Sequence, residues 1–183
     1  MDTQNEYPLS FRQARPDAEE RRRQLKDDRN PLYLVLDGLS DPRNVGSLFR
    51  LADAGRLAGI YLVGMDKRLL EGKAGRVARA TMSLVAHWFV PDWNSWKTES
   101  PADINLLALE WTDQSQPYHT ISPSWPMGLV IGNEQRGISK EGLQNCQASI
   151  HIPMLGLNSS MNVSVATGIA VYGMLQQGEM LKE

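Results

Sequence analysis

IPMLGLNSSMNVSVAT, residues 152–167, is the stretch that decides the fold. It begins at the end of an apolar strand that Pro153 breaks, and a polar loop follows before a weakly polar helix begins near Asn162. The loop offers amides, hydroxyls and carboxamides beside an apolar wall, which suits a medium-sized, partly apolar ligand. Ser160 or Asn162 can equally be the N-cap of the final helix, and the stretch alone does not decide between the two interpretations.

The composition fits one globular domain. The chain has 183 residues, a hydrophobic content of 42% and a net charge of −2, which predicts no strong overall attraction to nucleic acid but allows a local basic face. Its one cysteine, Cys146, excludes an internal disulfide, and no histidine is spaced from it like a zinc ligand, so we expect no metal site. The N-terminus has no signal-peptide core, and residues 163–175 are too short to span a bilayer. We therefore expect a cytoplasmic protein without a membrane partner.

Short apolar runs alternate with helical segments on either side of this stretch. The pattern predicts an α/β fold with a mostly parallel sheet flanked by helices. The expected strands are residues 31–37, 60–63, 85–90, 104–109 and 127–131, and the expected helices are 45–54, a short one within 91–103, 140–146 and 163–175. Residues 112–126 are rich in Ser, Pro and Gln and predict a loop.

Two segments are candidates for RNA contact. Residues 1–30 are polar and charge-dense, and we interpret them as an arm, with a solvent-facing helix near 17–26, that precedes a domain of residues 31–183. The cations that can contact RNA phosphates are Arg21, Arg22 and Arg23 in the arm and Lys73, Arg76 and Arg79 in the basic segment 67–81. The alternative in both segments is a solvated helix, whose charges in the arm pair at i,i+4.

Unusual polar residues follow the ends of the expected strands. Asn44 stands at the start of a helix, Arg50 lies six residues further on, and Glu134 follows Gly132 in a tight loop. Because open α/β sheets bind ligands at the carboxyl ends of their strands, we expect these residues to gather at one edge, with Asn44 and Arg50 on one side of their helix. Gly132 would let the backbone approach a ligand. A surface arginine and a surface turn are the ordinary alternatives for Arg50 and Glu134.

Three motifs, NVGSLFRLADAGRLAG, VIGNEQRGIS and IPMLGLNSSMNVSVAT, resemble in this order and spacing the signature of the SPOUT superfamily of RNA methyltransferases. The branch is the one that methylates the ribose 2′-hydroxyl, of the tRNA guanosine-2′-O-methyltransferase type. Met161 stands where the family usually has leucine, which is a conservative change.

The resemblance implies a C-terminal trefoil knot, whose loops bind S-adenosylmethionine, and a homodimer formed through the final helix. By position, Gly132, Ile152 and Met161 would contact the cofactor, with the backbone of Leu109 and Leu157 nearby.

The resemblance also implies catalytic roles. Arg50 would activate the 2′-hydroxyl, Asn44 would position Arg50 or the ribose, Glu134 would fix the loop geometry or Arg50, and Ser160 and Asn162 would hold substrate and loop. Since a guanidinium is essentially always protonated, the destination of the hydroxyl proton stays open.

The expected substrate is tRNA, with rRNA a close second. A non-catalytic knotted RNA-binding protein and a base methyltransferase are the remaining alternatives. A nucleotide-dependent enzyme of another kind has little support, because neither G-x-G-x-x-G nor G-x-x-x-x-G-K-[ST] is present.

Overall fold

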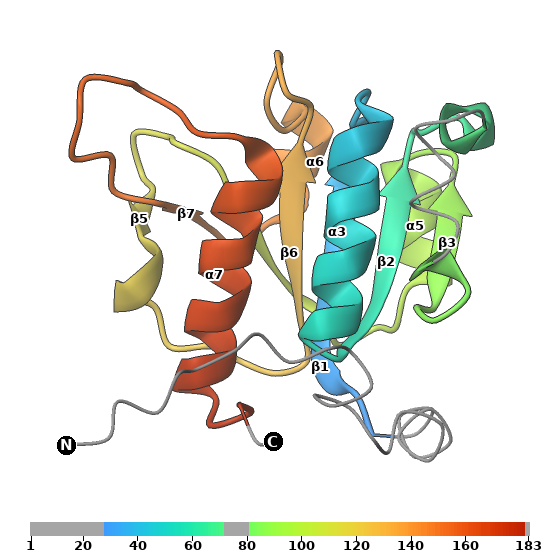
Figure 1. Ribbon diagram of the computed structural model, residues 1–183, viewed down its shortest axis with the longest axis horizontal. Helices are drawn as coiled ribbons and strands as arrows, with labels where there is room; N and C mark the ends of the chain where they lie inside the picture. Colours follow the sequence, from blue (N-terminus) through green and yellow to red (C-terminus); the bar gives the residue numbers. More distant parts are fainter. Residues whose placement is uncertain (1–27, 72–80, 182–183) are drawn as a thin grey trace, which may run out of the picture.

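The computed structural model describes residues 28–71 and 81–181, in which seven strands form one sheet in the order β3-β2-β1-β6-β4-β7-β5 (Figure 1). All pairings between neighbouring strands are parallel. The strands are β1 (Asn30–Asp37), β2 (Leu57–Val63), β3 (His87–Val90), β4 (Asn105–Leu109), β5 (Gln116–Pro117), β6 (Met127–Gly132) and β7 (Ala148–His151). The predicted α/β fold with a parallel sheet is confirmed.

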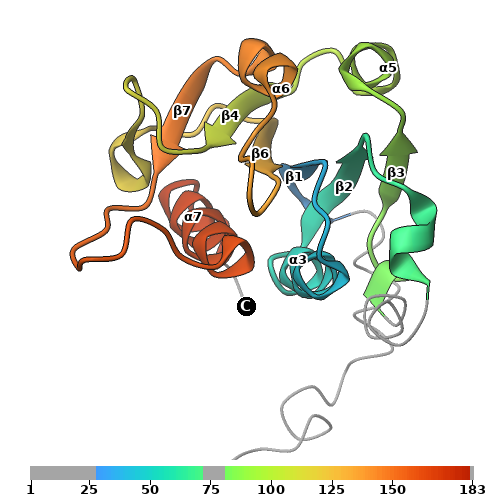
Figure 2. The same cartoon turned by 90° about the horizontal axis from the view of Figure 1, so that it is seen from above.

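Helices cover both faces of the sheet (Figure 2). Helices α3 and α7 lie side by side on one face, and α5 and α6 lie on the other. The helices are α3 (Pro42–Ala54), α5 (Trp93–Glu99), α6 (Lys140–Asn145) and α7 (Val163–Gln177), with short 3-10 turns at Lys67–Leu70 and Tyr118–Thr120. No helix in the described ranges is long and apolar enough to cross a membrane.

The sheet has an apolar layer on each face, which explains why its central strands are almost continuously apolar. In β1, Leu34 and Leu36 pack into the cluster beneath α3 and α7, while Val35 packs into the cluster beneath α5 and α6. All three side chains are fully buried. The strand is therefore held by packing on both faces, and the loop that follows it lies at the carboxyl edge of the sheet.

The strands and helices predicted for residues 31–71 and 81–181 are present, with shifted boundaries, while the helix expected near residues 17–26 lies outside the described residues. Helix α3 begins at Pro42 instead of residue 45, because Asp41 accepts a hydrogen bond from the Arg43 amide as N-cap and Pro42 occupies the first turn. Strand β2 begins at Leu57, which places Gly59 inside it, where a Cβ atom would lie 2.6 Å from the Trp88 ring. Residues 112–126 are not all loop, since they contain β5 and a 3-10 turn. A two-residue edge strand that contains proline is too short to produce a strand pattern.

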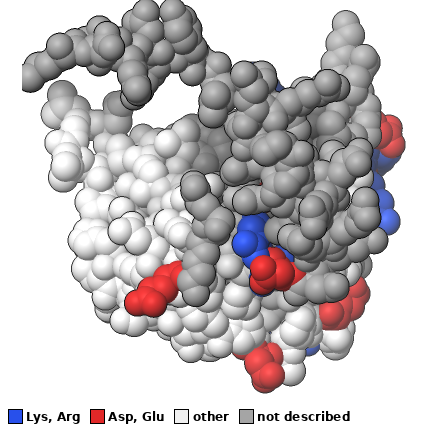
Figure 3. Space-filling model, turned by 60° about the horizontal axis from the view of Figure 1, so that its bottom comes forward, with Lys and Arg blue, Asp and Glu red and all other residues white. Residues whose placement is uncertain are grey.

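Several predictions fall outside the described residues or stay untested. The arm with Arg21, Arg22 and Arg23 lies outside the described ranges, as do Lys73, Arg76 and Arg79 of the basic segment. The division into an arm and a domain, and the knot, stay predictions. In the view of Figure 3, the charged side chains of the described residues are scattered and form no broad positive patch.

Candidate functional site

The carboxyl edge of the sheet holds a pocket of about 530 Å³. It lies where the loops after β1, β4, β6 and β7 meet the first turn of α7. The predicted site residues that line it are Asn44, Leu109, Gly132, Glu134, Ile152, Ser160, Met161 and Asn162. The structure thus brings the three motifs together at one edge, as the strand-end pattern predicts.

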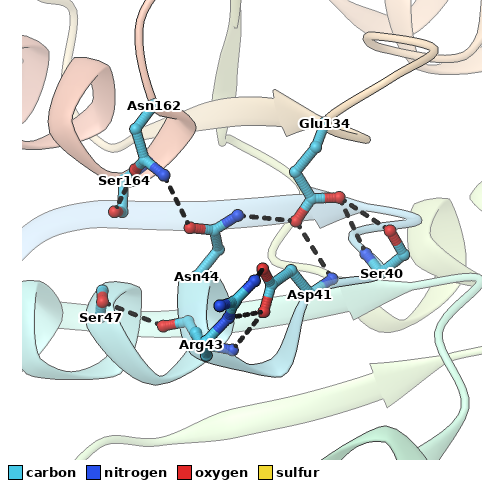
Figure 4. Close-up of polar contacts among 8 residues, drawn as sticks. All are labelled: Ser40, Asp41, Arg43, Asn44, Ser47, Glu134, Asn162 and Ser164. Carbon is cyan, nitrogen blue, oxygen red and sulfur yellow. Dashed lines mark hydrogen bonds and ion pairs between the residues drawn. The ribbon is translucent and has the colours of Figure 1, made fainter.

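A chain of hydrogen bonds joins these three motifs through their side chains (Figure 4). Nδ2 of Asn44 donates to Oε1 of Glu134 over 2.9 Å, and Nδ2 of Asn162 donates to Oδ1 of Asn44 over 3.1 Å. Asn44 is the middle member, and only 8% of its surface is exposed. A polar side chain this deeply buried needs partners on both ends of its amide, and the two neighbouring loops supply them.

The ends of this chain fix the orientation of both amides. An ionised carboxylate can only accept, so Asn44 must turn its NH2 group to Glu134 and leave its oxygen for Asn162. At the other end, Oδ1 of Asn162 accepts from the backbone amides of Ser164 and Val165, at 2.9 and 3.4 Å. These amides can only donate, which leaves the NH2 group of Asn162 for Asn44. The chain therefore runs in one direction, from α7 to Glu134.

Glu134 anchors the loop between β1 and α3. Besides Asn44, its carboxylate accepts from the Ser40 amide at 3.1 Å, the Ser40 hydroxyl at 2.9 Å and the Asp41 amide at 3.1 Å. Burial by itself would raise the pKa of Glu134, but the hydrogen bonds from Asn44 and Ser40 outweigh it and lower the pKa from 4.5 to about 2. Glu134 is therefore ionised at neutral pH, and it is too weak a base to accept a proton from a sugar hydroxyl.

Asn162 satisfies both interpretations of the final stretch. It is the N-cap of α7, because its side chain accepts from the first free amides of the helix. The same side chain donates to Asn44 and lines the pocket. Capping and site geometry are therefore one arrangement, and Ser160 lines the pocket without being the cap.

Gly132 is required by the packing of its own loop, in addition to any contact with a ligand. A Cβ atom at this position would lie 2.1 Å from the backbone of Gly137 and of Ile138. The close neighbour is thus the chain's own turn, in which Asn133 and Gly137 exchange backbone hydrogen bonds and Gly137 adopts a φ of +69°. This close crossing of the backbone holds Glu134 in place, and because Gly132 also lines the pocket, the expected approach of a ligand to its backbone stays a prediction.

Arg50 does not point to the same side of α3 as Asn44. Six residues at 100° each turn the helix through 600°, so the two side chains lie about 120° apart around its axis. Asn44 is buried, whereas Arg50 is exposed and is not among the residues that line the pocket. The side chain of Leu157 is also fully exposed and lies outside the lining. The expectation that Asn44 and Arg50 share one side is therefore wrong.

Strand-end residues that the motifs did not single out complete the pocket. Glu110 and Trp111 follow β4, and His151 ends β7. Glu110 accepts from the amides of Trp111 and Ile138, at 3.0 and 3.1 Å, and so ties the β4 loop to the β6 loop. Their signal was their place directly at the ends of predicted strands.

The pocket suits a ligand of the size and chemistry of S-adenosylmethionine. Its volume lies within the range of small-molecule sites, about 300–1,000 Å³. Its lining combines apolar side chains with the carboxamides of Asn44 and Asn162 and the Glu134 carboxylate; the apolar ones are Leu109, Ile152, Met154, Met161 and Val163. The cavity thus offers apolar surface for the purine and for the carbons beside the sulfur. It also offers oxygen acceptors for the positively charged sulfonium.

Comparison with known proteins identifies the family to which the chain is similar. Residues 31–172 match the model of the SpoU rRNA Methylase family. Over 154 residues the chain is 30% identical to the 23S rRNA (guanosine-2′-O-)-methyltransferase RlmB of Haemophilus influenzae, a match that covers 84% of this chain and 63% of that protein. The chain spans about three fifths of the length of the curated relatives it matches.

Two solved structures are similar in fold. The A. aeolicus TrmH/SpoU tRNA modifying enzyme aligns with a TM-score of 0.77 at 25% identity, over 91% of this chain and 85% of that one. The AdoMet-bound rRNA methyltransferase from Sinorhizobium meliloti aligns with a TM-score of 0.68 at 30% identity, over 86% of this chain and 61% of that one. With the family match over residues 31–172, these findings show that the chain belongs to the SpoU rRNA methylase family.

Proposed function

We propose that this protein transfers the methyl group of S-adenosylmethionine to a ribose 2′-hydroxyl of RNA. The observation that carries the proposal is the hydrogen-bond chain from Asn162 through Asn44 to Glu134, which assembles the three family motifs around one pocket. A relative at 30% identity is named as a guanosine-2′-O-methyltransferase, and another solved relative at 30% identity contains AdoMet.

The cofactor would supply a carbon already activated for transfer, which leaves the protein to align the reactants and to stabilise the oxygen nucleophile. Leu109, Ile152 and Met161 would hold it through apolar contacts, with Gly132 keeping the neighbouring turn close. The exposed Leu157 belongs to the same loop as Met161 and contributes to this site through its backbone.

The polar residues have separate tasks in this proposal. Glu134 keeps the loop after β1 in place, because its low pKa and its hydrogen-bond donors make it an anchor instead of a base. Asn44 and Asn162 set the position of that loop against α7, and Ser160 contacts the substrate. Arg50 stabilises the developing negative charge on the 2′-oxygen, as a guanidinium that donates without losing its proton.

This role for Arg50 requires a second copy of the chain, because Arg50 does not line the pocket of its own subunit. Helix α7 lies beside α3 and carries the exposed apolar side chains Val165 and Tyr172, whose exposed fractions are 54% and 42%. We therefore propose a homodimer formed through α7, in which Arg50 of one copy serves the pocket of the other. Apolar side chains exposed on one helix are the surface that such a contact would bury.

The proposed RNA is tRNA, and rRNA is the second candidate. The A. aeolicus structure is that of a tRNA modifying enzyme, while the Haemophilus influenzae relative is named for 23S rRNA. The cations that would contact phosphates are Arg21, Arg22, Arg23, Lys73, Arg76 and Arg79. The proposed location is the cytoplasm.

The test is methyl transfer from radiolabelled S-adenosylmethionine to total RNA, with and without Arg50→Ala. We expect incorporation with the wild-type protein and loss of it in the variant, and mass spectrometry of nucleosides would find the label on ribose. Label on a base would replace this function with base methylation. Cofactor binding by calorimetry separates an inactive RNA-binding protein, which would release no heat, from an enzyme.

A further inference from the structure

A tryptophan stands at the rim of the pocket. Trp111 follows directly after β4, and 58% of its surface is exposed although it lines the pocket. Its indole stacks on the imidazole of His151, with ring centroids 4.6 Å apart and planes 23° from parallel. Because one face of the indole is covered by His151, the exposed surface lies chiefly on the opposite face.

His151 is itself held in a fixed orientation. Its Nδ1 lies 2.9 Å from Oγ of Ser115. The same hydroxyl donates to the Thr112 carbonyl at 2.8 Å, so Ser115 ties the imidazole to the loop after β4. His151 also ends β7 and pairs there with Pro117 of β5. The imidazole is thus a rigid support behind Trp111.

Trp111 itself is fixed at its backbone. Its amide donates to Oε1 of Glu110, whose other oxygen accepts from the Ile138 amide. A large aromatic ring that is supported from behind, anchored at its backbone and open in front has the form of a stacking platform. Unpaired RNA bases are bound by stacking on such aromatic side chains.

We propose that Trp111, supported by His151, stacks on an unpaired base of the RNA substrate at the mouth of the pocket. The inference rests on the proposed function and deepens it by naming a contact to the substrate. The RNA is favoured over the cofactor because Trp111 lies at the exposed rim, whereas Gly132, on the cofactor side, is buried and Leu109 and Ile152 are partly buried. Stacking needs no particular base, so the platform would orient the nucleotide without selecting its sequence.

The experiment compares Trp111→Leu, which removes the ring, with Trp111→Phe, which keeps an aromatic face. Trp88→Leu is the matched control, because Trp88 is also exposed, at 40%, but belongs to β3 at the far edge of the sheet. The full chain is titrated with a fluorescein-labelled single-stranded RNA oligonucleotide without cofactor, and separately with S-adenosylmethionine by calorimetry.

We expect Trp111→Leu to weaken RNA binding at least about fivefold, with less loss in Trp111→Phe and none in Trp88→Leu. Cofactor affinity should stay within about twofold in all three variants. The fluorescence that Trp111 contributes is the difference between wild type and Trp111→Phe. This contribution should be quenched by the oligonucleotide and not by the cofactor. A purely structural role of Trp111 would not give this signature.

Unchanged RNA affinity in Trp111→Leu would overturn the inference. Equal losses of RNA and cofactor affinity, or quenching by the cofactor alone, would also overturn it and assign the ring to the adenine. A wild-type protein that binds no S-adenosylmethionine contradicts the proposed function instead, and the RNA titration then still decides whether Trp111 stacks on a base.

Discussion

Asn162 donates a hydrogen bond of 3.1 Å to Asn44, although 118 residues separate them along the chain. The bond joins the first turn of α7 to the first turn of α3, and Asn44 continues it to Glu134. Because each amide has only one orientation that satisfies its neighbours, the three motifs behave as one unit. Substitution of Asn162, Asn44 or Glu134 should therefore alter the positions of the other two side chains.

Asn162→Asp tests whether this connection matters beyond capping. Aspartate is as good an N-cap as asparagine, so the cap is kept, and we expect the free energy of unfolding to fall only by the about 1–3 kcal/mol that the loss of the donor to the buried Asn44 oxygen costs. It has no NH2 group for Asn44, and the pocket loops lose their alignment, so kcat for methyl transfer should fall about a hundredfold. Urea denaturation and a radiolabel assay measure the two effects. Wild-type kcat in this variant would show that capping is its whole contribution.

Glu134→Gln tests the anchor through its pH dependence. The folded-state pKa of about 2 lies below the ordinary 4.5, so the carboxylate stabilises the fold above pH 4.5, and this stabilisation is lost as the pH falls from 4.5 to about 2. The variant should be less stable than wild type at neutral pH, and the difference should vanish near pH 2. Thermal denaturation across this interval provides the measurement. A difference that stays constant with pH would mean that the charge of Glu134 contributes nothing.

Gly132→Ala should be strongly destabilising, because its Cβ would overlap the backbone of Gly137. We expect a loss of about 3 kcal/mol, since backbone must move to make room. Gly156→Ala, in the loop after β7, is the matched control, because nothing lies within 4 Å of a Cβ there. The control should remain within about 0.5 kcal/mol of wild type in urea denaturation. Equal stability of both variants would mean that the backbone of the turn after β6 can move at little cost in free energy.

Arg50→Ala and Asn162→Asp should restore each other's activity when mixed. Each is expected to be inactive alone, but a mixed dimer would combine the intact pocket of the first chain with Arg50 of the second. In an equal mixture half of the dimers are mixed and each has one complete site, so about a quarter of the wild-type activity should return. The two variant chains are refolded together in equal amounts, and methyl transfer by the mixture is then measured. Failure to recover activity would place Arg50 and Asn162 in the same subunit's site, or outside the reaction.

Tyr172→Asp and Val165→Asp test the dimer itself. A carboxylate on the exposed face of α7 would have to be buried without a partner in the interface, so both variants should be monomeric by light scattering. Trp88→Asp, on the edge strand β3, should stay dimeric. A dimer that survives both changes on α7 must use another surface.

The position of the pocket could be predicted from the sequence, because open α/β sheets bind ligands at the carboxyl ends of their strands. Apolar runs such as residues 31–37 give the strands, and the parallel order places the loops that follow them at one edge. Asn44 and Glu134 could be singled out because they directly follow the ends of expected strands. The α/β class and these two residues follow from local pattern, whereas the choice of Asn162 as a site residue rests on the resemblance to the SPOUT superfamily, because its stretch alone also fits a simple N-cap.

The remaining details depend on distances that no local pattern contains. A spacing of six residues is close to two turns, but the helical period turns the Arg50 side chain about 120° away from that of Asn44. The need for glycine at position 132 comes from a turn five residues further on, which only the fold reveals. Trp111 and His151 lie 40 residues apart and meet because β4 and β7 are neighbours in the sheet.

The contact between Asn162 and Asn44 also sets the moment at which the site can exist during synthesis. Ribosomes make the chain from its N-terminus, so β1, α3 and the loop with Glu134 are complete while α7 has yet to be translated. Until the residues near 167 have left the exit tunnel, the buried carboxamide of Asn44 has only one of its two partners. A nascent chain that stalls before that point would have most of the sheet but an incomplete pocket.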